Sequence, residues 1–178
     1  MCVGNVAGQS APDCSNVNYN GDGTEANPYE VSNVDQLQCI SEQDLGANYV
    51  QVSDIDASGT SAWNGGDGFD PIGDILLDTP FTGIFNGADH TISDLYIDRE
   101  STNDVGLFGL VDSGRLENTH LNNADVSGSE GVGGLVGDKA GGTVRESYAT
   151  GKVDSSAELD SEAGGLIGEG NNDVTDSY

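Results

Sequence analysis

The stretch GVGGLVG, residues 131–137, decides the fold of this chain. Four of its seven residues are glycine, the residue that loses most backbone freedom on folding. Its side chains come only from Val132, Leu135 and Val136, so the pattern predicts a buried strand. A fold that tolerates so much glycine must bring neighbouring backbones into close contact.

The motif repeats along the chain. GLFG at 106–109 and GLIG at 165–168 match GLVG at 134–137, so their leucines Leu107, Leu135 and Leu166 are 28 and then 31 residues apart. Each copy is followed by a second block, which reads RLENTHL at 115–121, TVRESYA at 143–149 and DVTDSY at 173–178. A divergent copy, FTGIFNGADHTISDLYI, occupies residues 81–97. Self-similarity at such a period indicates a repeat architecture with one structural unit per copy.

The second blocks align into columns that predict which side chains face inward. The aliphatic column faces the core and consists of Ile92, Leu116, Val144 and Val174. The polar column consists of Asp94, Asn118, Glu146 and Asp176. The aromatic column faces outward and consists of Tyr96, His120, Tyr148 and Tyr178. This alternation is typical of a strand with one buried face.

These repeats predict an all-β fold, a right-handed parallel β-helix (solenoid) whose coils stack about 4.8 Å apart. Helical hairpins are disfavoured because Gly, Ser, Asn and Asp are weak helix formers. β-Propeller blades need about 40 residues, and leucine-rich repeats need a denser leucine framework. The second and third copies read VGGL and AGGL where the first reads VGL, which predicts a bulge or a wider corner.

The three G-L-x-G copies, each followed by a block like VRESYATGKV, resemble the GLUG-motif repeats of bacterial and archaeal surface and secreted proteins. FDPIGD at 69–74 and GDGTEANPYEVSNVDQLQCI at 21–40 are similar to the leader of those repeats, so the resemblance covers about 21–178. It implies a β-helix-like region of a long exported protein, often adhesin-like. Some family members are IgA-specific metalloproteases, but the chain has no H-E-x-x-H motif, so that activity is not expected here.

The chain divides into three predicted regions: an irregular lead-in over 1–20, an N-terminal cap with the first coils over 21–80, and repeats over 81–178. The repeats span about 81–104, 105–131, 132–162 and a truncated 163–178. A short helix over 31–43, with Ser32 or Asn33 as its N-cap, is predicted to close the N-terminal end of the core. Because the sequence stops partway through a repeat, we expect a C-terminal edge able to pair with a second chain.

Charge dominates the composition. Thirty-one Asp and Glu residues against five Lys and Arg give a formal net charge of −26. This charge excludes nucleic acid and anionic membranes as partners, and no apolar run reaches the about 18 residues that membrane insertion requires. Intrinsic disorder is one interpretation of such acidity, but the repeats argue against it. Molar salt would screen the surface repulsion, so we predict a haloarchaeal source.

Three cysteines, Cys2, Cys14 and Cys39, form no zinc-binding pattern. A disulfide between Cys14 and Cys39, as in an exported protein, and three unpaired thiols both remain open.

The sequence contains no catalytic constellation. The aromatic column Tyr96, His120, Tyr148 and Tyr178 is the predicted contact surface for a glycan or a surface protein. Calcium is the one candidate cofactor. Its candidate ligands lie in NYNGDGTE at 18–25 and in the acidic pair Asp54/Asp56. These ligands are Asn18, Asn20, Asp22, Asp54 and Asp56.

We therefore predict a non-enzymatic extracellular or cell-surface module that acts as an adhesive region or a structural spacer in high salt. The alternative is a glycan-active β-helix enzyme, a polysaccharide lyase or hydrolase, that uses surface carboxylates. Its candidate carboxylates are the acidic pairs Asp54/Asp56, Asp67/Asp70 and Asp74/Asp78, which could act as acid and base or bind calcium.

Overall fold

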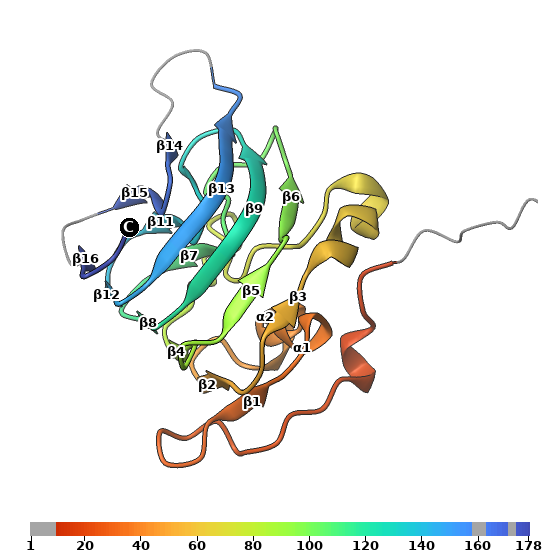
Figure 1. The fold of residues 1–178 in the computed structure, drawn as a ribbon, viewed down its shortest axis with the longest axis vertical. Helices are drawn as coiled ribbons and strands as arrows, with labels where there is room; N and C mark the ends of the chain where they lie inside the picture. The colour runs from red at the N-terminus through yellow and green to blue at the C-terminus, as the bar shows by residue number, and fades with distance from the viewer. Residues whose placement is uncertain (1–9, 158–162, 171–173) are drawn as a thin grey trace, which may run out of the picture.

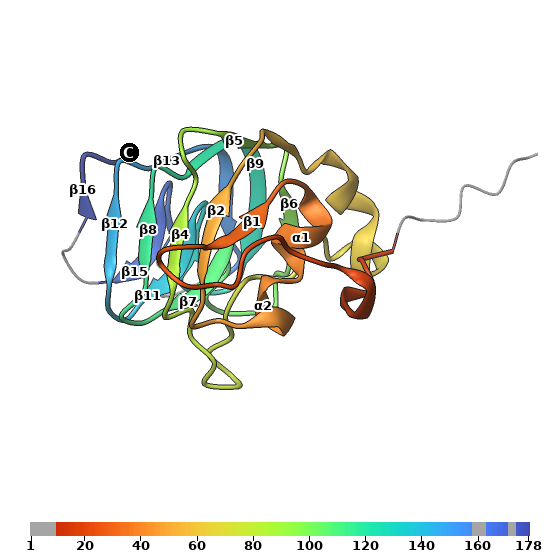
Figure 2. The same ribbon diagram turned by 90° about the horizontal axis from the view of Figure 1, so that it is seen from below.

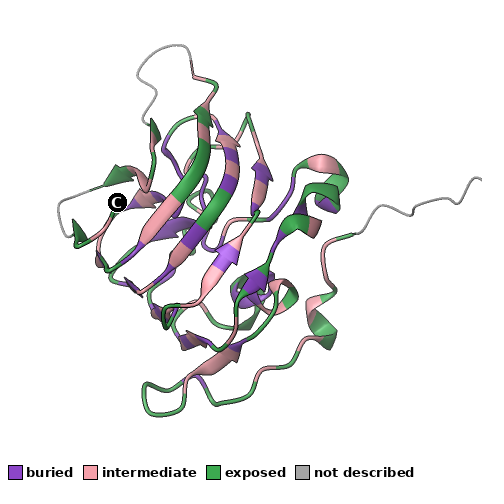
Figure 3. Ribbon diagram, in the orientation of Figure 1, coloured by how far each residue is buried: buried purple, intermediate pink, exposed green. Residues whose placement is uncertain are grey.

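The computed structural model describes residues 10–157, 163–170 and 174–178 of the chain. This part is mostly β structure with few helices, and its sheets curl around one core like half of a barrel (Figure 1). All pairings between the named strands are parallel. Buried and less buried residues alternate along much of β9 (His120–Gly128), as Figure 3 shows.

The largest sheet takes one strand from each successive pass of the chain. Its order is β1 (Tyr29–Val31), β2 (Asn48–Gln51), β4 (Ile84–Asn86), β8 (Arg115–Glu117), β12 (Thr143–Arg145) and β16 (Val174–Thr175). A line of fully buried apolar residues crosses this sheet from Phe85 through Leu116 to Val144. Val144 in turn pairs with Val174, which confirms the predicted register of the last three copies.

Three further sheets complete the fold. The second has the order β13 (Tyr148–Ser155), β9, β5 (Thr91–Ser93) and β3 (Ile55–Asp56), with β6 (Tyr96–Asp98) also paired to β9. The third has the order β15 (Ile167–Gly170), β11 (Val136–Lys139) and β7 (Phe108–Val111), and a small sheet joins β10 (Val132–Gly133) to β14 (Ala163–Gly164). The copies over 105–131 and 132–162 run β7–β8–β9 and β11–β12–β13, so each adds one strand to each of three sheets.

The predicted alignment of the divergent copy at 81–97 is wrong by one strand. Phe85, rather than Ile92, pairs with Leu116, and Ile92 pairs with Leu121 in the next strand. Both strands of this copy have a buried apolar residue between two half-buried ones, so alternation alone fits either register. Asp94 consequently leaves the polar column and instead accepts a hydrogen bond from Asn123 Nδ2 (2.6 Å).

The rest of the polar column turns the chain at one corner. Asn118, Glu146 and Asp176 all adopt left-handed backbone, with φ of 46°, 49° and 52°. Asn and Asp tolerate this conformation better than other residues that carry a Cβ, whereas Glu146 adopts it at a cost. The corner therefore explains why this column is polar.

A ladder of hydroxyl groups lies immediately after that corner. Ser147 Oγ donates to the carbonyl of Arg145 (2.8 Å) and accepts from the backbone N–H of Thr119 (3.1 Å). Ser177 repeats both contacts in the next copy, with the carbonyl of Thr175 and with the N–H of Ser147. Because Thr119 is fully buried, this hydroxyl satisfies a backbone N–H that water cannot reach, whereas the carbonyl of Arg145 also accepts from the N–H of Asn118 (3.2 Å).

The doubled glycine produces the predicted bulge. Val105 pairs with Val132 while Phe108 pairs with Val136, so the second copy fits one extra residue between the same two partners. The copies also stack in very close contact. A Cβ on Gly137 would lie 2.2 Å from the carbonyl carbon of Asp104, and one on Gly133 would lie 2.6 Å from the backbone nitrogen of Gly168 in the next copy. Glycine is therefore required at these positions by backbone proximity.

The predicted helix over 31–43 is present but divided in two. α1 (Val34–Gln38) and α2 (Ile40–Gln43) are separated by Cys39, whose ψ of 4° departs from helical geometry. Asn33 is the N-cap, since its Oδ1 accepts from the N–H of Gln36 (3.0 Å). The helices lie beside the β1–β2 end of the fold (Figure 2).

The disulfide between Cys14 and Cys39 is formed, which settles one of the two alternatives for these cysteines. It ties the helix break to the short 3₁₀ helix η1 (Cys14–Asn16), and a longer 3₁₀ segment, η2 (Ser58–Gly66), follows β3. Cys2 lies outside the described residues.

Replacing Ser147 by alanine should lower the free energy of unfolding by about 2 kcal/mol, because the buried backbone N–H of Thr119 loses its acceptor. The matched control is Ser177→Ala, which removes the same pair of contacts at a more exposed position, where water can replace the hydroxyl. Urea unfolding at one fixed salt concentration measures both variants. If both variants lose the same free energy of unfolding, burial does not determine how much each hydroxyl contributes.

Candidate binding surfaces

Three of the four residues in the predicted aromatic column form a stack, here called the aromatic ladder. The ring centroids of His120 and Tyr148 lie 4.4 Å apart at an interplanar angle of 18°, and those of Tyr148 and Tyr178 lie 5.4 Å apart at 11°. Residue pairing positions these rings, because His120 and Tyr148 are the first residues of the neighbouring strands β9 and β13. Tyr178 is the most exposed of the three, at 76%.

Tyr96 does not belong to this ladder. Thr91 occupies the equivalent position beside His120, while Tyr96 pairs with Asp125 further along β9. The one-strand error in aligning the divergent copy accounts for this difference. Tyr96 Oη donates to Asp98 Oδ2 (3.2 Å), and the pKa of its phenol is raised by burial and by that carboxylate.

A shallow groove of about 530 Å³ runs along the aromatic ladder. Its other lining residues are Asp89, Asn118, Glu146, Ser147 and Asp176. Because the rings stack on one another, they present their edges rather than their faces along most of the groove. The groove therefore offers ring edges beside three carboxylates.

The predicted calcium ligands take part in local hydrogen bonds. Asp22 Oδ1 accepts from the N–H of Thr24 (3.1 Å), and hydrogen bonding to Thr24 lowers the pKa of this carboxyl. Asn20 Nδ2 donates to Glu30 Oε2 (2.9 Å), and Asn18 Nδ2 donates to the carbonyl of Asn16 (3.2 Å).

Asp54 and Asp56 also accept backbone hydrogen bonds, Asp54 from a distant part of the chain and Asp56 within a turn. Asp54 Oδ1 accepts from the N–H of Thr91 (2.9 Å) and lies 3.4 Å from His90 Nδ1, while Asp56 Oδ1 accepts from the N–H of Ser58 (2.9 Å). These hydrogen bonds lower the pKa of both carboxyls. Within the described residues, no group of three or more His, Cys, Asp and Glu side chains is placed to hold a metal ion. Calcium binding stays a prediction.

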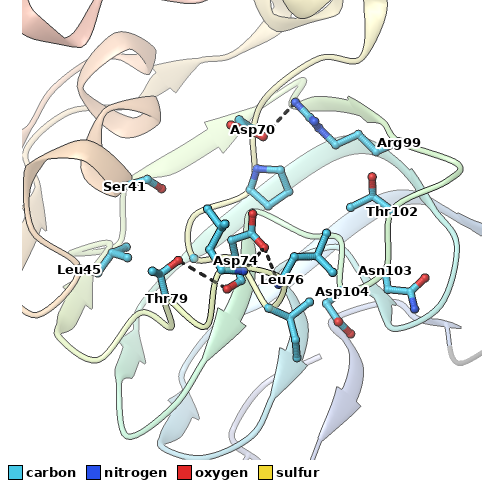
Figure 4. Close-up of a pocket in the computed structure, with 14 residues that line it drawn as sticks. Ser41, Leu45, Asp70, Asp74, Leu76, Thr79, Arg99, Thr102, Asn103 and Asp104 are labelled. Carbon is cyan, nitrogen blue, oxygen red and sulfur yellow. Dashed lines mark hydrogen bonds and ion pairs between the residues drawn. The ribbon is translucent and has the colours of Figure 1, made fainter.

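A second groove, which the sequence did not predict, lies between the loops at 70–79 and 99–104 and has a volume of about 430 Å³ (Figure 4). Arg99 closes one side through its Nη2, which lies 3.0 Å from Asp70 Oδ1. Asp74 shapes the opposite side, where its Oδ1 accepts from the backbone N–H of Leu76 (2.7 Å). The run Ile75-Leu76-Leu77 in an acidic loop is the signal that could have indicated this surface.

Asp104 carries the strongest electrostatic perturbation in this groove. Burial raises the pKa of its carboxyl to about 6, with further increases from the negative charges of Asp138, Glu169 and Glu130. Its backbone is also left-handed, with φ of 58°. Asp104 is therefore a carboxyl that titrates closer to neutrality than an ordinary aspartate.

Taken together, these features define a class: a repetitive, mainly parallel β protein with a strongly acidic surface and open, shallow grooves. No helix among the described residues has the combined length and apolarity to span a bilayer. No family model matches the chain.

The chain is 44% identical over 156 residues to a segment of Halomucin from Haloquadratum walsbyi, an alignment that covers 85% of this chain and 2% of that protein. It is also 35% identical over 126 residues to a protein of Evansella cellulosilytica named as a Gly-rich membrane protein, covering 69% of this chain and 14% of that protein. The chain thus spans a small fraction of the length of both relatives.

Among solved structures, the chain is similar to a Bacteroides ovatus protein described as an immunoglobulin A1 protease. The TM-score is 0.46 at 18% sequence identity, and the alignment covers 86% of this chain and 65% of that chain.

Replacing Asp104 by asparagine should raise the thermal midpoint above pH 6 and leave it unchanged below pH 3.8. The folded pKa of about 6 exceeds the ordinary value of 3.8, so ionisation destabilises the fold as pH rises through this window. Asparagine removes the charge and keeps the tolerance for left-handed backbone. Melting curves between pH 3.5 and 8 are the measurement.

The control is Asp78→Asn, because Asp78 is exposed and also left-handed, with φ of 52°. It should show no such pH-dependent gain. If the thermal midpoint of the Asp104 variant rises equally at every pH, the cause is the backbone preference of asparagine. That result would contradict the argument from charge.

Proposed function

We propose that this chain is a stack of coils, a right-handed parallel β-helix of GLUG-type repeats, within a long extracellular or cell-surface protein adapted to high salt. In this proposal residues 1–20 lead in, residues 21–80 form the cap and first coils, and residues 81–178 form the repeats. The observation that carries it is the passage of successive copies through three sheets in the same order. Such a stack is built by adding identical units, which suits an adhesive region or a structural spacer.

Similarity and composition support the surface location. The 44% identity links the chain to Halomucin, whose name denotes a mucin and whose organism is Haloquadratum walsbyi. The net charge of −26 suits a protein that stays dissolved at high ionic strength, where repulsion between surface carboxylates is screened. The Cys14–Cys39 disulfide fits an oxidising, extracellular compartment.

Folding should depend on salt if the acidic surface is an adaptation to it. The β-sheet signal in circular dichroism should be complete in 3 M KCl and reduced in 0.1 M KCl, because dilute salt leaves the carboxylate repulsion unscreened. The thermal midpoint should rise with KCl over the same range. Full β structure and an unchanged midpoint in 0.1 M KCl would contradict the adaptation.

The aromatic ladder and its groove are the contact surface in this proposal, with a glycan or a surface protein as partner. Tyr148→Ala should weaken binding to immobilised cell-surface glycans at least tenfold, because it removes the middle ring of the ladder. Tyr96→Ala is the matched control, since Tyr96 lies outside the ladder. If the Tyr148 variant binds these glycans as tightly as the unmodified chain does, the aromatic ladder is not the contact surface.

A second candidate function is a glycan-active enzyme at the groove of Figure 4. The pKa of about 6 at Asp104 favours it, because a general acid needs a raised pKa. Against it, Asp70 is paired with Arg99 and Asp74 holds a loop. Cleavage of acidic polysaccharides in molar KCl, lost in Asp104→Asn, would favour the enzyme over the spacer.

A further inference from the structure

The outer face of the largest sheet differs in charge from the chain as a whole. Phe85, Leu116 and Val144 are buried in the core, so their neighbours on β4, β8 and β12 face outward, and Figure 2 shows these strands side by side. The outward positions, here called the arginine face, are Ile84, Asn86, Arg115, Glu117, Thr143 and Arg145. Two of the chain's five basic residues and only one of its 31 acidic residues lie there. The arginine face is therefore locally cationic.

Glu117 holds two guanidinium groups in place on this face. Arg115 Nη1 lies 3.1 Å from Glu117 Oε1, and Arg145 Nη2 lies 3.1 Å from Glu117 Oε2. The side chain of Glu117 is 8% exposed, whereas those of Arg115 and Arg145 are 46% and 47% exposed. Strand register fixes the arrangement, because Arg145 pairs with Glu117 and Arg115 lies two residues earlier on the same face of β8. A buried carboxylate thus orients two half-exposed cations.

The pairing with Glu117 leaves both arginines able to bind a further anion. Two guanidinium groups share one carboxylate, so the cluster keeps one positive charge. Each guanidinium has five N–H donors and turns one terminal nitrogen toward Glu117. Among the described residues, neither guanidinium has a second ion-pair partner. Arg99 differs, because its Nη2 pairs with Asp70 and its Nε donates to a backbone carbonyl.

A small hollow of about 190 Å³ adjoins the arginine face on the side of β2 and β4. Its polar lining consists of Glu25, Asn48, Asn86, Arg115 and Glu117. Asn86 Oδ1 accepts from a backbone N–H (2.8 Å), and Asn48 Nδ2 donates to a backbone carbonyl (3.1 Å). Asn86 Nδ2 and Asn48 Oδ1 are the amide groups left to bind hydroxyls. The hollow is smaller than the about 300 Å³ of a drug-sized pocket, so it admits a single ring.

We propose that the arginine face binds a sugar residue that carries a carboxylate, a uronate of an acidic glycan. The carboxylate contacts Arg115 and Arg145, because the guanidinium fork matches the two oxygens of a carboxylate. The hydroxyls of the same sugar lie in the hollow against Asn48 and Asn86. Glu25 repels a second acid group there, so the site takes one carboxylate for each bound sugar.

High salt permits this contact despite the net charge of the chain. At 1 M ionic strength the Debye length is about 3 Å, so repulsion between the acidic chain and an acidic glycan is screened beyond direct contact. Charge-assisted hydrogen bonds act at about 2.8 Å, which is inside that length. The hollow shares no lining residue with the groove of the aromatic ladder. The inference therefore goes beyond the proposed contact surface, and either site could fail without the other.

Nuclear magnetic resonance of the 178-residue chain in 3 M KCl tests the proposal. The chain has only the arginines Arg99, Arg115 and Arg145, so their Nε–Hε signals can be assigned individually. Trigalacturonate should shift the signals of Arg115 and Arg145 in a saturable way and leave that of Arg99 unchanged. Its methyl ester, which keeps the sugars and lacks the charge, should shift none of them.

A variant identifies the residues responsible. Arg145→Gln should raise the dissociation constant for trigalacturonate at least tenfold, because it removes one charged donor of the pair. Arg99→Gln is the matched control, since it removes an arginine from a different surface and should leave the constant unchanged. Circular dichroism verifies that each variant is folded, and the titration of the unmodified chain tests the site without any substitution.

Several results would overturn the proposal. These are the absence of saturable shifts at Arg115 and Arg145, equal shifts at Arg99, or an Arg145→Gln variant that binds as tightly as the unmodified chain. If tri-glutamate binds as tightly as trigalacturonate, the partner is an acidic peptide and the assignment to a sugar is wrong. Tyr148→Ala should leave the response of the arginine signals unchanged. Loss of that response would place the ligand on the aromatic ladder instead.

Discussion

Close contact between successive backbones is the constraint on which the rest of the structure depends. At Gly133 and Gly137 the neighbouring backbone occupies the space of a Cβ, so these positions admit no side chain. The flanking Val132, Leu135 and Val136 are consequently the groups that fill the core, and all three are fully buried. The glycines cost backbone entropy, and parallel hydrogen bonding between copies offsets it.

Much of this architecture could be predicted from the sequence because it repeats. The three G-L-x-G copies predict the register of the last three copies correctly, and Asn33 is the predicted start of the helix. The divergent copy was misaligned because Phe85 and Ile92 both lie at buried positions in strands of the same burial pattern, and only pairing distinguishes them. That error placed Tyr96 in the predicted contact surface, whereas the observed pairing puts it beside Asp125.

The groove between the loops at 70–79 and 99–104 could not be predicted from sequence patterns, for a different reason. Its lining comes from loops near residues 41–45, 70–79 and 99–104, which are brought together only by the fold. The raised pKa of Asp104 likewise depends on Asp138 and Glu169, which lie on neighbouring strands far away in the sequence. Periodicity identifies strands that repeat, whereas loop surfaces are specific to each copy.

The Cys14–Cys39 disulfide would also limit how far the chain extends when it is pulled from both ends. It joins residues 25 positions apart, and the sheets themselves are held by hydrogen bonds between neighbouring strands. A force applied through the two ends of the chain would bypass the enclosed segment, since the covalent bridge carries the tension. About 85 Å of extension is thereby withheld, at roughly 3.4 Å per residue.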